Sequence, residues 1–119
     1  MSKIQLNNIM FYGFHGVYEY EREQGQKFYF DVEMRTADDK AAETDDLKDG
    51  VDYIAVYSLV KDVVENKRFQ MLTALTAHIG DKILEAYPNI VLVKTRVRKT
   101  SVLIMGPIDY LEVETERRR

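Results

Sequence analysis

The sequence contains no cysteine and no tryptophan, and it has only two histidines and two prolines among its 119 residues. Without cysteine, neither a disulfide framework nor a thiolate metal site can form, which suits a reducing compartment. No segment reaches the roughly 18 consecutive apolar residues that span a membrane, and the N-terminus lacks the apolar run of a signal peptide. We therefore expect a cytoplasmic protein with no membrane partner.

Excess positive charge is also missing. The formal net charge is -3, the isoelectric point is near 5.4, and the only basic cluster is the run Glu116 to Arg119 at the C-terminus. Such a balance gives no general attraction for phosphate backbones, so we expect no nucleic-acid partner. We expect the basic run itself to be a solvated end.

Several catalytic motifs are absent too. His15 and His78 are far apart in sequence and form no H-x-H or H-E-x-x-H arrangement, so we predict no metal site and no cofactor. We expect backbone hydrogen bonds near a turn to hold His15, and we expect His78 to lie at the rim of a helix. The sequence has no G-x-G-x-x-G, Walker or G-x-S-x-G motif, which argues against dinucleotide, nucleotide-triphosphate and serine-hydrolase chemistry.

Hydrophobic periodicity defines the predicted elements. Alternation of apolar and polar residues predicts strands over residues 3–13, 25–36, 90–99 and 108–116. The second strand is the clearest, because one face carries Phe28, Phe30, Val32 and Met34. In the third strand the predicted apolar face is Val91, Val93, Thr95 and Val97. Apolar residues at helical spacing predict helices over 53–65 and about 71–86, and Pro88 would close the second.

We predict that the segments between these elements are surface connections. Residues 17–25 are too polar and acidic for a core element. Residues 37–53 are typical of a long surface connection that could include one helical turn. The order strand, strand, helix, helix, strand, strand predicts a single α+β domain over residues 1–119. Its four-stranded antiparallel sheet would carry two helices on one face. Because the outer strands would expose unpaired edges, we expect a homo-oligomer.

Three segments contain residues that a stable core alone would not require, although each also has a simpler structural explanation. Gly13 and Gly16 precede three glutamates that could face a ligand, although a tight turn with solvated acids explains them too. Val51 to Tyr53 lie at the mouth of the first long helix, where Asp52 could simply be its N-cap and Tyr53 a packed aromatic. Lys99 stands where the third strand ends. There a partly desolvated ammonium group could act as an acid and base, although most lysines at strand ends only aid solubility.

Three blocks, "FYGFHGVYEYEREQGQKFYFDVE", "KAAETDDLKDGVDYIAVY" and "VRKTSVLIMGPIDYLEVE", resemble the bacterial dihydroneopterin aldolase family in order and spacing. The resemblance covers essentially the whole chain. It implies the tunnelling fold, in which subunits assemble into a ring-shaped barrel of four that is commonly stacked into an octamer. It also implies a lyase of folate biosynthesis that splits 7,8-dihydroneopterin into 6-hydroxymethyl-7,8-dihydropterin and glycolaldehyde, and that also epimerises the side chain. Neither a metal nor a Schiff base is implied.

The same resemblance assigns roles to individual residues. Lys99 takes the place of the acid-base lysine, Tyr53 would come from the neighbouring subunit to handle the proton of the enol, and Glu21 would contact the substrate side chain or its water. The pterin-binding residues would be Gly16, Val17, Val51, Asp52, Leu72 and Thr73.

Thr73 departs from the family pattern, because relatives carry there a glutamate that binds the pterin amino group and ring N–H. A hydroxyl group cannot replace that bidentate contact, so pterin affinity should fall. The loop after Lys99 differs as well, with Thr100, Val102, Leu103 and Met105 in place of a proline-rich turn. Either another group anchors the pterin, or evolution or engineering has reshaped the pocket for a different aldolase or epimerase substrate. A phosphorylated pterin fits poorly beside the acidic residues 19–23, and a non-catalytic pterin-binding ring is the third reading.

Overall fold

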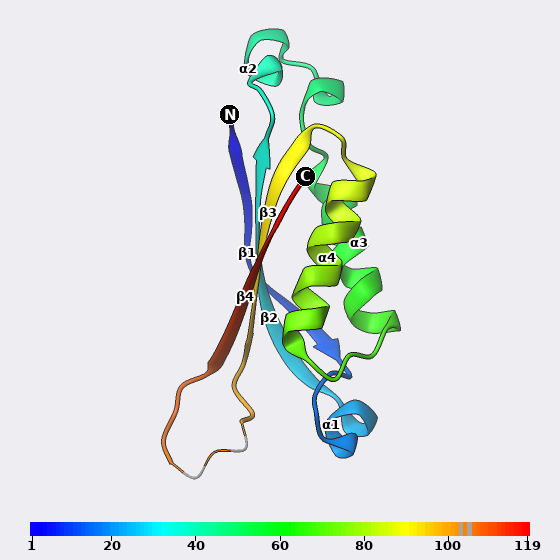
Figure 1. Ribbon diagram of the computed structural model, residues 1–119, viewed down its shortest axis with the longest axis vertical. Helices are drawn as coiled ribbons and strands as arrows, with labels where there is room; N and C mark the ends of the chain where they lie inside the picture. Colours follow the sequence, from blue (N-terminus) through cyan, green and yellow to red (C-terminus); the bar gives the residue numbers. More distant parts are fainter. Residues whose placement is uncertain (103, 105) are drawn as a thin grey trace.

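The computed structural model describes residues 1–102, 104 and 106–119, and it forms one sheet backed by two long helices (Figure 1). The elements in chain order are β1 (Lys3–Gly13), α1 (Glu19–Gln24), β2 (Gln26–Thr36), α2 (Lys40–Thr44), η1 (Leu47–Asp49), α3 (Tyr53–Asn66), α4 (Leu72–Ala86), β3 (Ile90–Lys99) and β4 (Leu111–Arg118). The predicted α+β class and the predicted order of the long elements are confirmed.

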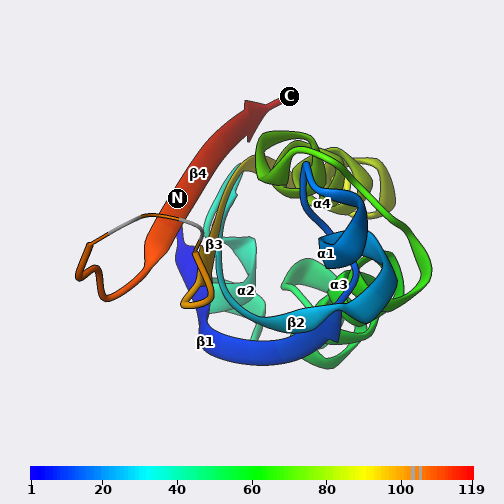
Figure 2. The ribbon, with the colours of Figure 1, turned by 90° about the horizontal axis from the view of Figure 1, so that it is seen from below.

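The sheet has the strand order β1-β2-β3-β4, and every neighbouring pair is antiparallel. Both long helices pack on the same face, with α3 over β1 and α4 over β3 and β4. Seen from below, the sheet curves beside the helices and its other face carries no helix (Figure 2). β1 and β4 are the edges of this sheet.

The core lies between the sheet and the helices. Phe28, Phe30, Val32 and Met34 are fully buried, which confirms the alternation predicted for β2. Leu75, Ile79 and Ile83 of α4 are also fully buried and belong to the same hydrophobic cluster. Because strand side chains alternate between faces, the residues between them in β2 are directed to the helix-free face of the sheet.

Both long helices begin and end close to the predicted positions. The carboxylate of Asp52 accepts hydrogen bonds from the backbone N–H groups of Ile54 and Ala55, so Asp52 is the N-cap of α3. Helix α4 ends at Ala86, two residues before Pro88, as expected for a residue that cannot continue a helix. No helix among the described residues is long and apolar enough to cross a membrane.

The connection between β1 and β2 differs from the prediction. It contains α1, whose Glu21 is buried, so this acidic segment is more than a solvated loop. The backbone N–H of Glu21 bonds to the carbonyl of Tyr18, and the Glu21 carboxylate reaches back to the N–H of Tyr18. These two hydrogen bonds at the N-terminus of α1 stabilise a helical conformation in this polar segment.

The prediction for the C-terminus was wrong in one respect. The basic run is exposed to solvent, as expected, but most of it belongs to β4, which begins at Leu111 and runs to Arg118. The guanidinium group of Arg119 donates to the backbone carbonyls of Tyr87, Leu84 and Ile90, and that of Arg117 pairs with Asp81 at 2.7 Å. The predicted face of β3 was also wrong at one end: the register shifts between Arg35 and Thr36, which leaves Val91 partly exposed.

Candidate active site

A lysine and a glutamate from distant parts of the chain meet at one end of the molecule. The ammonium Nζ of Lys99, at the end of β3, donates a hydrogen bond of 2.8 Å to Oε2 of Glu21 in α1. The two side chains are only 12% and 7% exposed. An ion pair so far removed from water is shielded from salt screening, and its geometry is held by the strand end and the short helix together.

Glu21 is held in its charged form by several donors. Its Oε1 accepts from the backbone N–H of Tyr18, and its Oε2 accepts from Nε2 of Gln26, both at 3.3 Å. Burial alone would raise the pKa of Glu21, but the hydrogen bonds from Lys99 and Tyr18 outweigh it and keep the pKa below its ordinary value. Glu21 is therefore a carboxylate at neutral pH.

The backbone at Gly16 lies directly against this carboxylate. Gly16 has φ +155, and a Cβ atom there would stand 2.5 Å from the carboxyl carbon of Glu21. The guanidinium group of Arg22 donates to the carbonyls of Gly16 at 2.8 Å and Val17 at 2.7 Å. The predicted binding residues Gly16 and Val17 are thus fixed beside Glu21, and only glycine allows the close approach.

His15 ties this segment to the beginning of α4. It is fully buried; its Nδ1 accepts from the backbone N–H of Phe69 at 3.1 Å, and its Nε2 lies 2.9 Å from the carbonyl of Val64. The N–H of Gly16 in turn donates to the carbonyl of Phe69 at 2.9 Å. The prediction that backbone bonds hold His15 is confirmed, but these bonds reach the end of α3 and the α3–α4 connection.

Burial lowers the pKa of His15, and the bond to the Val64 carbonyl opposes that shift only in part. With Nδ1 accepting from an N–H group, the proton of the neutral ring is on Nε2. His15 therefore acts as a neutral link between two backbone segments. His78 is half-buried on α4, as expected for a rim residue.

A cavity of about 110 Å³ lies next to the pair. Its lining comes from α1, the start of β2 and the segment after β3: Tyr20, Glu21, Gln24, Gly25, Gln26 and Ser101. Gln26 is the residue that the sequence analysis missed. Its amide donates to Glu21, while its Oε1 is buried with no hydrogen-bond partner. A glutamine at the start of a strand gives no signal in a single sequence, because polar residues are common at strand ends.

The beginning of α4 lies at the same end of the molecule as Lys99 (Figure 1). Leu72 is 7% exposed and belongs to the core cluster, whereas Thr73 is exposed in the first turn. The backbone carbonyl of Thr73 accepts a hydrogen bond from the hydroxyl group of Thr76. Leu72 is therefore part of the core, whereas the side chain of Thr73 is exposed to solvent.

The structure does not bring Val51, Asp52 and Tyr53 to Lys99. They lie where α3 begins, at the opposite end of the long axis from α1 and the end of β3 (Figure 1). The side chain of Tyr53 is 58% exposed, and Asp52 caps the helix. A single chain therefore keeps these two groups of predicted site residues apart. Leu103 and Met105, two of the loop residues that differ from the family pattern, lie outside the described residues.

Among the described residues, no group of three histidine, aspartate or glutamate side chains is placed to hold a metal ion. The chemistry available at Lys99 is that of an ammonium group and a carboxylate beside a small cavity. Such a pair can donate and accept protons, and it can hold a water molecule or a hydroxyl group in a fixed orientation.

Comparison with known proteins gives consistent results. The dihydroneopterin aldolase (FolB) family model matches residues 4–116. Dihydroneopterin aldolase 2 of Arabidopsis thaliana is 38% identical over 119 residues, covering 99% of this chain and 91% of the relative. A dihydroneopterin aldolase of Streptococcus pyogenes serotype M1 is 32% identical over the full length of both chains. The structure of E. coli dihydroneopterin aldolase in complex with neopterin superimposes with a TM-score of 0.86 at 26% identity, covering 98% and 99% of the two chains.

Proposed function

The chain belongs to the dihydroneopterin aldolase family and is a lyase of that type, and we propose that Lys99 moves the protons in its reaction. The observation that carries the proposal is the contact of 2.8 Å between Lys99 and the charged Glu21, beside a cavity and largely out of water. A proton-transfer group needs a fixed position within hydrogen-bond reach of its substrate, and this contact supplies one.

The proposed reaction is the cleavage of 7,8-dihydroneopterin. The bond between the first and second carbons of the side chain breaks as the hydroxyl group on the second carbon loses its proton, and glycolaldehyde leaves. The electron pair of the broken bond passes into the pterin ring, which is protonated at N5, and gives an enol. Protonation of the first carbon and loss of the proton from N5 then yield 6-hydroxymethyl-7,8-dihydropterin. In this scheme Lys99, with an ordered water, donates and accepts protons, and Glu21 orients the side chain or its water.

The second half of the proposed site comes from another subunit. Tyr53 is exposed and far from the Lys99 of its own chain, so it can meet a Lys99 only across an interface between copies. Both edge strands of the sheet are long, with 11 residues in β1 and 8 in β4. Unpaired edges of this length favour pairing between chains, which supports a ring of four subunits or a stacked octamer. Val51 and Asp52 would then reach the pterin from the same side as Tyr53.

Thr73 supports a second candidate. Its side chain is exposed at the start of α4, at the same end as Lys99, and a hydroxyl group there offers one weak contact where a carboxylate would offer two strong ones. The alternative is an aldolase or epimerase on the same scaffold that acts on a different substrate. Epimerase activity, independence from metal and a cytoplasmic location stay predictions, as does the non-catalytic ring.

The test is turnover of 7,8-dihydroneopterin, followed by the appearance of glycolaldehyde. Lys99→Ala should reduce turnover by about 100-fold or more, the range expected for removal of a general acid-base group. Lys82→Ala on α4 removes an equal charge elsewhere and serves as the control. Equal turnover in these two variants would refute the role of Lys99.

The Thr73→Glu variant separates the two candidate substrates. If the unmodified chain turns over 7,8-dihydroneopterin, another group anchors the pterin and the family reaction is its own. If only Thr73→Glu does so, the pocket serves a different substrate. Tight pterin binding without product in both proteins would support the non-catalytic ring.

A further inference from the structure

The helix-free face of the sheet carries rows of charges that alternate in sign across the strands. In one row Arg96 of β3 is opposite Asp31 of β2 and Glu114 of β4, at 3.9 Å and 2.7 Å. In the next row Lys94 takes the central place and lies 3.9 Å from Glu116 on β4. In each of these rows a central cation therefore has a carboxylate on both neighbouring strands, so no cation lacks an opposite charge.

In the last row of this face the cations lie on the two outer strands of the row, and the central residue carries no charge. Arg35 of β2 and Arg118 of β4 flank β3, and the residue between them is Leu92. The neighbouring strands stand about 10 Å apart across β3. Two arginines thus flank an apolar residue, and this row has no negative charge between its cations.

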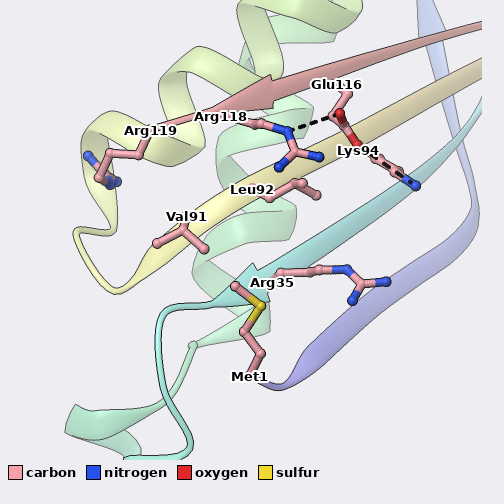
Figure 3. A pocket seen from close by; sticks show the side chains of 8 residues that line it. All are labelled: Met1, Arg35, Val91, Leu92, Lys94, Glu116, Arg118 and Arg119. Carbon is pink, nitrogen blue, oxygen red and sulfur yellow. Dashed lines mark hydrogen bonds and ion pairs between the residues drawn. The ribbon is translucent and has the colours of Figure 1, made fainter.

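A cavity of about 420 Å³ occupies this place, and its lining residues are those labelled in Figure 3. Leu92 is 7% exposed yet lies outside the hydrophobic core cluster, so the side chains around the cavity cover it. In Figure 3 the guanidinium group of Arg118 lies close to Leu92, and Arg35 extends from β2, on the other side of β3. Val91 and the side chain of Met1 complete an apolar floor.

The carboxylates nearby do not balance these cations. Glu116 is the one acidic residue in the lining, and it is shared between Arg118 at 3.2 Å and Lys94 at 3.9 Å. Arg35 has Glu33 at 3.5 Å, but Glu33 is itself shared with Lys3 at 3.9 Å. The cavity therefore has a surplus of positive charge, and the side chains of Arg35 and Arg118 are 41% and 69% exposed.

We propose that this cavity is a binding site for a small organic phosphate, whose anionic group takes the central place over Leu92 between Arg35 and Arg118. Guanidinium groups bind phosphate oxygens in a bidentate fork, and two of them on opposite strands fix both the position and the orientation of the group. The volume exceeds that of a phosphate ion, and the floor of Leu92, Val91 and Met1 suits the carbon part of the ligand.

This site is distinct from the pair of Lys99 and Glu21. It lies at the end of the sheet where β2 finishes and β3 begins, whereas Lys99 is the last residue of β3. An anion can bind here whether or not the lyase reaction takes place at Lys99. Binding here would place a phosphate-bearing metabolite on the same sheet as the catalytic residues.

Calorimetric titration of the assembled protein with inorganic pyrophosphate tests the proposal. The unmodified chain should bind it with a saturable isotherm, and Arg118→Gln and Arg35→Gln should each weaken binding by tenfold or more. Lys61→Gln, on the exposed side of α3, removes the same charge elsewhere and should leave the affinity unchanged. Equal affinities in all four proteins, or no binding to the unmodified chain, would overturn the proposal.

A second variant does not depend on loss of a cation. Leu92→Glu places a carboxylate at the centre of the row, where it can pair with both arginines, so it should abolish pyrophosphate binding. A Leu92→Met control keeps the apolar floor and should retain binding. Retained binding in a folded Leu92→Glu protein would place the anion elsewhere and refute the site.

Discussion

The Nζ atom of Lys99 and the Oε2 atom of Glu21 lie 2.8 Å apart, although the two residues are 78 positions apart in sequence. The contact joins the end of β3 to α1, the short helix that connects β1 to β2. Each charge is mostly removed from water, so each depends on the other for compensation. The pair therefore has a structural effect as well as the proposed catalytic one, and the two can be measured separately.

Lys99→Met should lower the free energy of unfolding by about 1–3 kcal/mol, because it leaves the carboxylate of Glu21 buried without its cation. Glu21→Gln should cost less, since an amide can still accept from the N–H of Tyr18. The double variant should cost less than the sum of the two single changes, because neither charge is then left alone. Denaturant unfolding of the four proteins gives the coupling energy, and strictly additive effects would contradict the pairing.

Gly16→Ala should disturb the same carboxylate from the backbone side. A methyl group at this position would stand 2.5 Å from the Glu21 carboxyl carbon, and φ +155 is a region that only glycine adopts readily. We expect a loss of about 1–3 kcal/mol from backbone strain, in addition to displacement of Glu21. Gly50→Ala is the matched control, since its new methyl group would meet its neighbours no closer than 3.6 Å. A Gly16→Ala protein as stable as Gly50→Ala would contradict this geometry.

Periodicity predicted most of the fold. The pattern of apolar residues indicates which side chains are buried, as in the alternation in β2 and the spacing of Leu75, Ile79 and Ile83 in α4. Burial of these side chains is what positions the two elements. Prediction failed where contacts distant in sequence decide the structure. The sequence predicted that Arg119 is only a solvated end, yet its guanidinium group donates hydrogen bonds to the backbone carbonyls of Tyr87, which follows α4, and Ile90, which begins β3.

The site was predictable only in its parts. Lys99 and Glu21 were identified by resemblance, but their contact depends on α1, whose acidic composition suggested a solvated loop. Gln26 was missed, because its role depends on a partner that periodicity does not reveal. The resemblance assigned Tyr53 to a neighbouring subunit, and in the single chain the start of α3 lies far from the end of β3.

His15 should make the protein less stable in mild acid. Its pKa is lowered from 6.5 in the folded protein, so the unfolded chain binds more protons than the folded one just below that pH. The contribution of the neutral ring is complete above about pH 6.5 and is lost as the pH falls through and below that value. His15→Asn should be less stable at neutral pH, because the shorter side chain cannot replace the Nε2–H group that donates to the carbonyl of Val64, and its stability should change less between about pH 7.5 and 5.5.

His78 is the necessary control for this measurement, because burial and the nearby Lys67 and Lys82 lower its pKa in the same direction. The two are the only histidines of the chain. Introducing His78→Gln first leaves His15 as the single histidine, and the remaining change in unfolding free energy with pH then belongs to it. A flat profile in His78→Gln, with the slope retained in His15→Asn, would assign the acid sensitivity to His78.

Mixing two inactive chains tests whether the site lies between subunits. Tyr53→Phe and Lys99→Ala each remove one half of the proposed site, so each protein alone should turn over 7,8-dihydroneopterin poorly. If Tyr53 acts across an interface, an equal mixture that has exchanged subunits places an intact Tyr53 opposite an intact Lys99 at about a quarter of the interfaces. Turnover should recover to about that fraction. If both residues acted from one chain, every chain in the mixture would lack one of them, and no exchange of subunits could restore activity.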